Sequence, residues 1–365
     1  MPEAHLKVLL LTGRFQFRGS SRQTLALARH LSDHHVDSMI ACSDARSIPR
    51  SERAGLHLRE YSSLESALFA RLGEWMIASD LRQDAPDLIH VQQRNMLAVG
   101  RRLAHRLQRP YVASIHDYLG PRETLRFEWR WCRKLIAVSQ SVKDELVRVA
   151  GIPADRIAVI HSGVEPVATS DAGEVLAPHR APVVGTAGPL EAGKGLRYFV
   201  DAIPAVLATH PETEFLIAGA GPEERSLRRR VMDLGAAEHV TFVPSLRDLG
   251  DSMSAMDIFV LPSLKQGLGT IMLEAMLRGR PVIATSAGGV QHVVADGRTG
   301  LLVPPRDSGA LAERVNELLD EPLRARAMGK AAHEYVEAEF PVARMVEQTA
   351  NLYHEVLGAV PVAAG

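Results

Sequence analysis

Residues 262–285, PSLKQGLGTIMLEAMLRGRPVIAT, form the segment whose residue types and spacing are best suited to chemistry. The pattern predicts that a strand ends at Pro262 and that a loop with Gly267 and Gly269 follows it. A helix is then predicted over residues 270–279, closed by a glycine. The amides at a helix start and the positive end of the helix dipole favour anions. The segment therefore predicts a diphosphate site.

Two charged side chains are spaced to complete such a site. Lys194 lies in a second loop, AGPLEAGKG, which follows a predicted strand and leads into the helix GLRYFVDAIPAVL. Its ammonium group can meet a phosphate held over that loop. Glu274 lies about one turn inside the other predicted helix and can accept hydrogen bonds from a ribose diol. Taken singly, each loop is more typical of a plain strand-to-helix turn, and AGPLEAGKG lacks the ending of a Walker A loop.

The elements that must hold these residues alternate along the whole chain. The segments predicted as strands are KVLLLT, DLIHV, PYVASIH and KLIAV in the first half, and PVVGTA, EFLIAGA, HVTFV, DIFVLP, RPVIATS and TGLLVP in the second. Amphipathic stretches separate them, such as the one with apolar residues at helical spacing from Leu64 to Met76, namely Leu64, Leu68, Leu72, Trp75 and Met76. This alternation predicts an α/β protein with parallel sheets.

Loop composition divides the chain into two halves of similar size. Residues 166–182 have no clear period and are the predicted linker. We expect one Rossmann-like domain over residues 1–165 and a second one over residues 183–339. Residues 340–358 are expected to form a helix that crosses back to the first domain. Two doubly wound domains facing a central cleft would bind ligands at the carboxyl ends of their strands.

Composition excludes several classes of protein. The formal net charge of −1 and pI of about 7.0 indicate no polyanionic partner, so no nucleic acid is expected. Two distant cysteines, Cys42 and Cys132, favour a reducing compartment. The apolar segment Leu6–Leu11 is too short for a signal peptide, and no uncharged apolar run of about 18 residues is present. A cytoplasmic protein is expected.

Several segments, in order and over nearly the whole chain, resemble family 4 glycosyltransferases, which are retaining enzymes with the GT-B fold. PSLKQGLGTIMLEAMLRGRPVIAT is similar to the family pattern PSxxEGFGxxxLEAMAxGxPVVAT, and AGPLEAGKG is similar to GRLxxEKG. The stretches IAGAGPEE, HVTFVPS, SAGGVQHVVADGRTGLLVP and AVSQSVKDELVRVAGIPADRIAVIHSGVE also match in order. The resemblance implies the fold and the nucleotide site, and it names neither donor nor acceptor.

The resemblance assigns roles by position. It implies that Lys194 holds the donor's diphosphate, that Glu274 holds its ribose, and that Gln266, at the first position of the family's E-x7-E pair, touches the sugar ring. Four successive amides would contact sugar hydroxyls and phosphate: those of Gly267, Leu268, Gly269 and Thr270. In the first half, SIHD places His116 at an active-site position near the donor sugar, although a histidine at a strand end is by itself more often structural.

The resemblance also places two loops beside the donor. Gly19, in the loop after the first strand, would lie near the phosphates. The base would lie against the loop that contains Val243, Ser245 and Leu246. No metal and no other cofactor is expected, because the chain has no Asp-x-Asp triplet to bridge a metal to a diphosphate.

The departures from the family pattern fall at ligand positions. Gln266 replaces a glutamate, so an amide takes the place of a carboxylate. Pro189 stands where the family usually has an arginine, which removes a positive charge from the leaving group's surroundings. His292 replaces a frequent glutamate, and Ser162 replaces an asparagine.

The implied reaction transfers a sugar from a UDP-, GDP- or ADP-sugar to a glycan or lipid-linked acceptor with retention at the anomeric carbon, as in cell-surface polysaccharide or lipopolysaccharide assembly. The departures at Pro189 and Gln266 support an alternative, a non-catalytic sugar-nucleotide-binding protein that regulates or scaffolds an active relative. A nicotinamide dehydrogenase is disfavoured because no GxGxxG follows the first strand.

Residues 122–134, RETLRFEWRWCRK, place arginines among aromatic residues. Arg122–Lys134 is predicted to form a helix with a solvated basic face and an aromatic core face. An alternative is a peripheral contact with the inner face of the membrane, because aromatic and arginine side chains together suit a headgroup interface.

Overall fold

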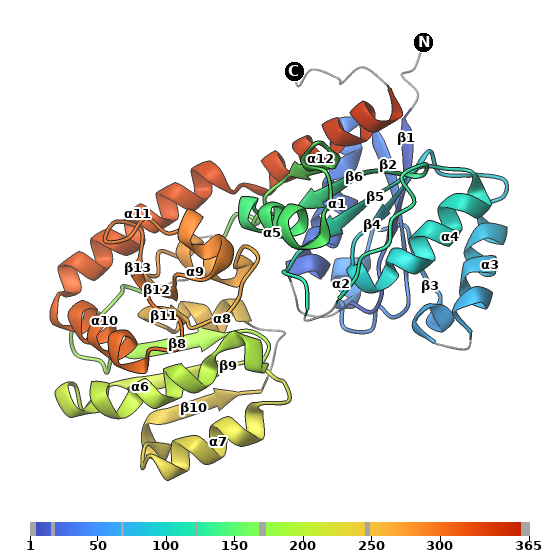
Figure 1. Cartoon of the computed structure of the whole chain (residues 1–365). Coiled ribbons are helices and arrows are strands. Elements are labelled where there is room, and N and C mark those ends of the chain that lie inside the picture. The colour runs from blue at the N-terminus through green and yellow to red at the C-terminus, as the bar shows by residue number, and fades with distance from the viewer. Residues whose placement is uncertain are drawn as a thin grey trace. The chain divides into compact units, whose positions relative to one another are not determined.

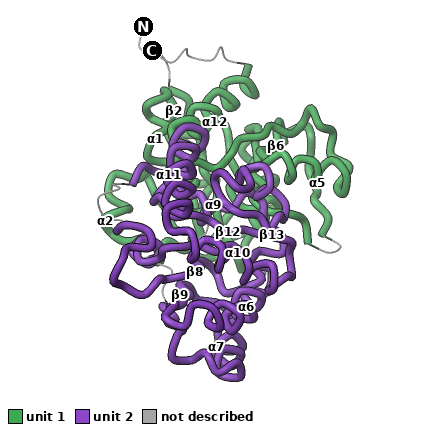
Figure 2. Tube along the Cα trace, turned by 90° about the vertical axis from the view of Figure 1, so that its left-hand side faces the viewer, with its two compact units in different colours: residues 1–163, 342–365 green, residues 164–341 purple. Residues whose placement is uncertain are grey.

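The computed structural model describes residues 5–15, 19–66, 69–120, 123–167, 173–244 and 249–358. The chain forms two compact units (Figures 1 and 2). The first consists of residues 1–163 and 342–365, and the second of residues 164–341. The first unit is therefore discontinuous in sequence, because the chain returns to it at Val342.

The first unit contains a seven-stranded sheet in which all pairs of neighbouring strands are parallel. The strand order is β3-β2-β1-β4-β5-β6-β7. The strands are β1 (Leu6–Leu11), β2 (Val36–Cys42), β3 (Leu58–Glu60), β4 (Leu88–Val91), β5 (Tyr111–Ile115), β6 (Cys132–Ala137) and β7 (Ile157–Val159). The helices are α1 (Gly19–His30), α2 (Arg50–Arg53), α3 (Ala70–Asp80), α4 (Leu97–Leu107), α5 (Gln140–Ala150) and α12 (Val342–Leu357). Successive residues of β1 from Val8 to Leu11 are all buried, which is typical of a parallel sheet covered on both faces.

The final helix, α12, is part of the core of the first unit. Its residues Met345 and Val346 belong to the same buried cluster as Val8 and Leu10 of β1. The hydroxyl of Tyr353 forms a 2.6 Å hydrogen bond with Nδ1 of His90 in β4. Burial lowers the pKa of His90 to about 3, so this ring is neutral at physiological pH.

The second unit contains a six-stranded parallel sheet with the order β10-β9-β8-β11-β12-β13. Its strands are β8 (Val183–Ala187), β9 (Glu214–Ala218), β10 (Val240–Val243), β11 (Ile258–Leu261), β12 (Val282–Thr285) and β13 (Leu301–Val303). Its helices are α6 (Leu196–Thr209), α7 (Glu224–Asp233), α8 (Leu249–Ser254), α9 (Thr270–Leu277), α10 (Ser308–Asp320) and α11 (Pro322–Glu339). The core contains Val260 of β11 and Phe199 of α6. The predicted α/β class with doubly wound parallel sheets is confirmed.

The predicted strands are all present, and three more strands were not predicted. They are β2, β3 and β7, of which β3 and β7 have only three residues each. β2 contains Asp37 and Ser38, so its sequence lacks the continuous apolar run that identified the others.

The predicted helix over Arg122–Lys134 is wrong. Arg122 lies outside the described residues, and the chain from Glu123 to Trp131 is irregular before it enters β6. The carboxylate of Glu123 accepts hydrogen bonds from the Gly120 amide and from Arg94, which holds the start of the segment away from helical geometry. Aromatic side chains in this segment also have low helix propensity.

Candidate functional site

The predicted donor-binding residues of the second unit follow two neighbouring strands, β8 and β11. β9 lies next to β8 in the direction of one edge of the sheet. β11 lies next to β8 in the direction of the other edge and is followed there by β12. The order of strands therefore reverses between β8 and β11. In open parallel sheets the carboxyl ends of two such strands are the usual ligand site. Lys194 follows β8, and residues 266–270 follow β11.

The loops after β8 and β11 are in direct contact. The amide of Leu264 donates a 3.0 Å hydrogen bond to the carbonyl of Gly193. Gly195 has a φ of +64°, and a Cβ atom there would lie 2.0 Å from the carbonyl oxygen of Pro262. Both the backbone conformation and the close approach require glycine. The two loops therefore behave as one structural unit.

Lys194 and Gln266 meet where these loops touch. The Nζ atom of Lys194 donates a 2.8 Å hydrogen bond to Oε1 of Gln266. The hydroxyl of Ser263 donates to the same oxygen over 3.2 Å. The main-chain carbonyl of Gln266 accepts from the Gly289 amide over 3.0 Å. The side-chain amide of Gln266 is therefore oriented, with its NH2 group directed away from the two donors.

Helix α9 begins directly after this contact. Gly269 precedes it with a φ of +91°, and its carbonyl accepts from the amides of Met272 and Leu273. The amides that precede these two at a helix start have no carbonyl of the helix to bond to, so the start of α9 suits an anion. Gly267 and Leu268 are buried, whereas Thr270 is half-buried.

The remaining predicted donor contacts are placed as follows. Glu274 lies one turn into α9 and is 7% exposed. Val243 ends β10, and its carbonyl accepts a 2.9 Å hydrogen bond from the amide of Gly219, at the end of β9. Ser245 and Leu246 lie outside the described residues, so the predicted base-binding loop is described only at Val243.

The first unit has its own reversal of strand order, between β1 and β4. The amide of Gly13, after β1, donates to Oε1 of Gln93, after β4, over 3.2 Å. The amide of Gln92 donates to the carbonyl of Leu11 over 2.8 Å. Gly19 is the first residue of α1, which follows β1.

His116 follows the neighbouring strand β5 and lies at this same edge. Its Nε2 atom is 3.0 Å from the main-chain carbonyl of Gln92. A carbonyl only accepts, so Nε2 carries the proton and Nδ1 of the neutral ring is an acceptor. Burial lowers the pKa of His116 to about 4, although the carbonyl of Gln92 opposes that shift. A neutral imidazole with a fixed tautomer can accept a hydrogen bond from a sugar hydroxyl.

Sequence reasoning did not select Ser263 and Gln92, although each contacts a predicted site residue. Ser263 lies inside the quoted segment PSLKQ, so proximity in sequence to Gln266 was an available signal. Gln92 acts through its main-chain carbonyl, for which a side-chain pattern carries no signal.

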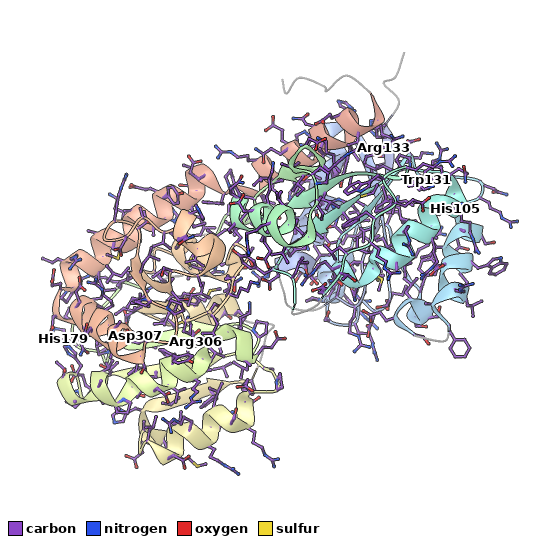
Figure 3. The ribbon with its side chains drawn as sticks, viewed as in Figure 1. His105, Trp131, Arg133, His179, Arg306 and Asp307 are labelled. Atoms are coloured by element: carbon purple, nitrogen blue, oxygen red, sulfur yellow. The ribbon has the colours of Figure 1, made fainter. Side chains whose placement is uncertain are left out.

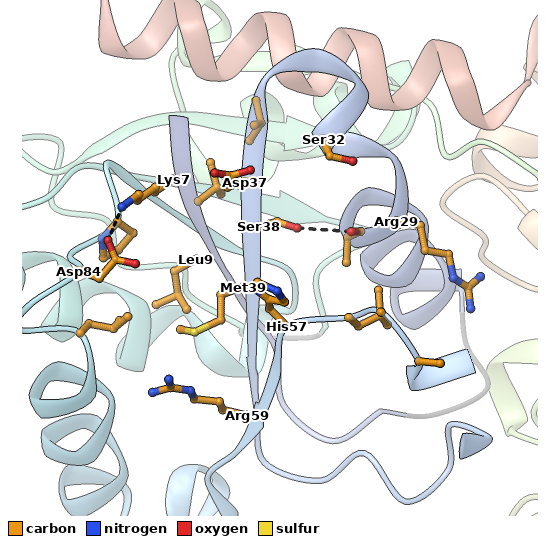
Figure 4. A pocket seen from close by; sticks show the side chains of 18 residues that line it. Lys7, Leu9, Arg29, Ser32, Asp37, Ser38, Met39, His57, Arg59 and Asp84 are labelled. Atoms are coloured by element: carbon orange, nitrogen blue, oxygen red, sulfur yellow. Dashed lines mark hydrogen bonds and ion pairs between the residues drawn. The ribbon is translucent and has the colours of Figure 1, made fainter. Parts of the chain in front are cut away.

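A separate cavity of about 710 Å³ lies in the first unit (Figure 4). It is lined from β1 and β2 by Lys7 and Asp37, and none of the predicted site residues lines it. Lys7 pairs there with Asp84, and Arg29 pairs with Glu52. Both of these cations therefore already have a carboxylate partner.

No group of three or more His, Cys, Asp or Glu side chains suited to a metal occurs among the described residues. No helix in the described part of the chain has the length and apolarity required to cross a bilayer.

Comparisons with known proteins identify the family. Residues 17–167 match the family Glycosyltransferase Family 4, and residues 181–321 match Glycosyl transferases group 1. The chain is 30% identical to the alpha-D-kanosaminyltransferase of Streptomyces kanamyceticus over 279 residues, which cover 68% of this chain and 71% of the relative. The chain therefore belongs to the group 1, family 4 glycosyltransferases.

Two further similarities extend the comparison. A GDP-mannose-dependent monoacylated alpha-(1-6)-phosphatidylinositol monomannoside mannosyltransferase of Corynebacterium glutamicum is 37% identical over 180 residues, or 47% of this chain and 46% of the relative. The structure of Anabaena HepE, solved with UDP and glucose, has a TM-score of 0.82 and 23% identity, and the match covers 96% of this chain and 100% of that chain. The fold is GT-B.

Proposed function

We propose that this chain transfers a sugar from a nucleoside diphosphate to a hydroxyl acceptor with retention at the anomeric carbon. The observation that carries the proposal is the hydrogen bond between Lys194 and Gln266, where the loops after β8 and β11 meet. This contact joins a cation to a side-chain amide in the loop that leads into α9. Family membership supports the reaction class.

The proposed step exchanges one bond at the anomeric carbon and transfers one proton. The bond between the anomeric carbon and the β-phosphate oxygen breaks, and the acceptor oxygen bonds to the same face of that carbon. An oxygen of the departing diphosphate takes the acceptor's proton. Lys194 and the start of α9 stabilise the charge that develops on the diphosphate, and such preorganised stabilisation is usually the largest contribution to catalysis.

The other residues position the donor. The carboxylate of Glu274 holds the ribose hydroxyls, and the chain at Val243 lies along the base. The NH2 group of Gln266 donates to the sugar ring. Nδ1 of His116 accepts from a sugar hydroxyl, since its Nε2 proton is engaged by Gln92. Cationic and amide groups perform the work of a metal in this scheme, so we propose that transfer is metal-independent.

Relatives support the donor and acceptor classes. The mannosyltransferase from Corynebacterium is named for a GDP-mannose donor and a phosphatidylinositol mannoside acceptor. HepE was solved with UDP and glucose. We accordingly propose a UDP- or GDP-sugar as the donor, with an ADP-sugar as the third candidate, and a glycan or lipid-linked acceptor.

The test begins with thermal shift and calorimetry, using UDP, GDP, ADP and their sugar conjugates, each with and without EDTA. A ligand that binds only the folded chain raises its melting temperature without any acceptor. We expect one nucleotide family to bind, with unchanged affinity in EDTA. Binding of none of them would contradict the proposal, and loss of binding in EDTA would contradict metal independence.

Turnover is tested next with the selected donor and a panel of glycan and lipid-linked acceptors. The anomeric configuration of the product, measured by NMR, should equal that of the donor, and inversion would contradict retention. Binding without turnover for both the natural chain and the Gln266→Glu variant would favour the regulatory or scaffold alternative, because the carboxylate missing from the family pattern would then be restored.

A further inference from the structure

Arg280 is a buried cation at the end of the second sheet that lies opposite to the proposed donor loops. It stands two residues before β12, and Asp257 stands one residue before β11, so both lie at the amino ends of parallel strands. Lys194 and Gln266, in contrast, follow the carboxyl ends of β8 and β11. The surroundings of Arg280 are therefore separate from the proposed donor site.

The Arg280 side chain is enclosed and only 1% exposed. Helix α11 packs directly against the turn before it, because a Cβ atom at Gly329 would lie 2.1 Å from the carbonyl oxygen of Gly279. The Nη2 atom of Arg280 donates a 2.8 Å hydrogen bond to the carbonyl of Gly173. Gly173 belongs to the segment that leads into β8 and that passes through His179, an exposed residue labelled in Figure 3. Arg280 is thus held between helix α11 and this segment.

Two of the three guanidinium nitrogens of Arg280 lack a protein partner. The Nε and Nη1 atoms are both buried, and neither has a hydrogen-bond partner among the described residues. Burial lowers the pKa of Arg280; the carboxylate of Asp257 opposes that shift, and the guanidinium groups of Arg180 and Arg278 add to it. An arginine nevertheless stays charged at every physiological pH. Arg280 is therefore a buried charge with unused donors, and buried charges require a partner.

Asp257 does not provide that partner, because its oxygens are already occupied. Its Oδ1 atom accepts from the amide of Leu176 over 2.6 Å and from Nη2 of Arg180. Its Oδ2 atom accepts from Nη1 of Arg180 and from the amide of Val183, each over 2.8 Å. A carboxylate has about four acceptor positions, so these four hydrogen bonds fill it. Arg180 also balances the charge of Asp257, which leaves the positive charge of Arg280 in excess.

We propose that Arg280 binds a chloride ion in this enclosed place. A hydrogen bond from a charged donor to an anion is stronger than one to a neutral partner such as water, and water does not balance the charge. A monovalent ion balances one excess charge, whereas a phosphate dianion would leave a buried negative charge behind. The site needs neither nucleotide nor acceptor, so it goes beyond the proposed transfer reaction.

A chloride ion there would stabilise the segment that leads into β8. The carbonyl of Gly173 in this segment accepts from Arg280. The carbonyls of Val175 and Leu176 accept 2.9 Å hydrogen bonds from Arg326 of α11. Because these contacts hold the segment against the second unit, an ion that lowers the cost of the buried Arg280 charge favours the folded state of that unit. The stability of the chain should therefore depend on chloride.

The experiment is differential scanning calorimetry of the full chain at constant sodium concentration, with chloride exchanged for gluconate. Gluconate is too large for the enclosed site. Mass action predicts that the melting temperature rises by about 3–5 °C for each tenfold increase in chloride above its Kd, measured over about a hundredfold range. Bromide should act like chloride, because it is also compact and monovalent.

Two matched variants separate the site from general effects of salt. Arg280→Met removes the proposed ligand, and Arg298→Met removes an exposed arginine from the same unit. Each variant loses one positive charge by the same substitution. We expect Arg298→Met to keep the chloride dependence and Arg280→Met to lose it. Equal chloride dependence of the two variants would overturn the proposal.

A second measurement uses the natural chain and does not require Arg280→Met to fold. Crystals grown in bromide should show an anomalous peak within hydrogen-bond distance of Nε or Nη1 of Arg280. Density for water without an anomalous signal would overturn the proposal. So would a bromide peak in a chain whose melting temperature is independent of chloride, because the ion would then be an adventitious ion only.

Discussion

The ammonium group of Lys194 and the side-chain oxygen of Gln266 are hydrogen-bonded at 2.8 Å, although 72 positions separate the two residues in sequence. If residue 266 were a glutamate, its carboxylate would lie beside the Lys194 ammonium group and would compete with a diphosphate for it. The amide of Gln266 adds no such negative charge. Its oxygen is occupied by Lys194 and Ser263, so in the proposed complex Gln266 would offer its NH2 donors to the sugar.

Replacing Lys194 should separate phosphate binding from nucleoside binding. We expect Lys194→Ala to weaken nucleoside-diphosphate binding about tenfold to a hundredfold, because a charge-assisted bond is worth roughly 1.5–3 kcal/mol, and to leave nucleoside binding nearly unchanged. Calorimetry with both ligands measures this. Lys265→Ala, which removes an exposed lysine from the loop after β11, is the matched control. If the variant loses as much affinity for the nucleoside as for the nucleoside diphosphate, Lys194 does not bind the phosphates.

Replacing Glu274 should weaken the hold on the ribose. Glu274→Gln keeps the size of the side chain and removes its charge, so nucleoside binding should fall by about tenfold. The 2′-deoxynucleoside is the internal control, since it lacks one of the two hydroxyls. If the variant loses as much affinity for the deoxy ligand as for the ribose ligand, the carboxylate does not contact that diol.

Adding one methyl group at Gly195 should damage the site and the stability of the second unit together. The new Cβ atom would lie 2.0 Å from the Pro262 oxygen, and the left-handed backbone alone costs about 1–2 kcal/mol for other residues. We expect Gly195→Ala to lower the melting temperature and to weaken nucleotide binding. Gly193→Ala is the control, because no atom lies within 4 Å of its Cβ position. Identical behaviour of the two variants would show that the loop contact is dispensable.

Replacing His116 should affect turnover more than affinity. His116→Ala removes the acceptor that we propose for a sugar hydroxyl and leaves the proposed nucleotide contacts of the second unit intact, so kcat should fall and the Kd for the nucleotide should stay within about twofold. The pKa of about 4 keeps the ring neutral. Turnover of the natural chain should therefore show no loss from His116 protonation between about pH 5 and 8. Unaltered kcat in the variant would make His116 purely structural.

The buried His90 should make the chain less stable in mild acid. Its folded-state pKa of about 3 lies below the ordinary value of 6.5, so the unfolded chain binds more protons between those values. The free energy of unfolding should then fall as pH decreases from about 6.5, by up to about 1.4 kcal/mol per pH unit for this one group. Urea unfolding at several pH values measures the slope. His90→Gln should reduce it, while His57→Gln, at an exposed position, should not.

The scaffold of the site was predictable because its signals are local. An apolar run before Pro262, a glycine pair and a helix over residues 270–279 follow from backbone preferences and burial, and the structure has a strand, a loop and a helix that ends at Leu277. The contact between Lys194 and Gln266 required the order of strands in the sheet, which a single strand's sequence does not contain. The positions assigned to His116, Glu274 and the α9 amides remain predictions about ligand contacts.

Other features were unpredictable for a physical reason. Helical spacing shows that Leu72 and Met76 share a face, yet both point outward, because spacing does not reveal what covers a face. The irregular path from Glu123 to Trp131 depends on partners such as Arg94 and Arg156, which lie outside the segment.

The return of α12 to the first unit has a consequence for synthesis on the ribosome. Residues 164–341 form one uninterrupted stretch and can fold as soon as they emerge. The first unit, although its sheet is made first, has to wait for Tyr353 to reach His90 before its core is closed. The unit whose sheet is translated first is therefore the last to complete its core. A chain that terminates before residue 342 lacks α12 and cannot complete the core of the first unit.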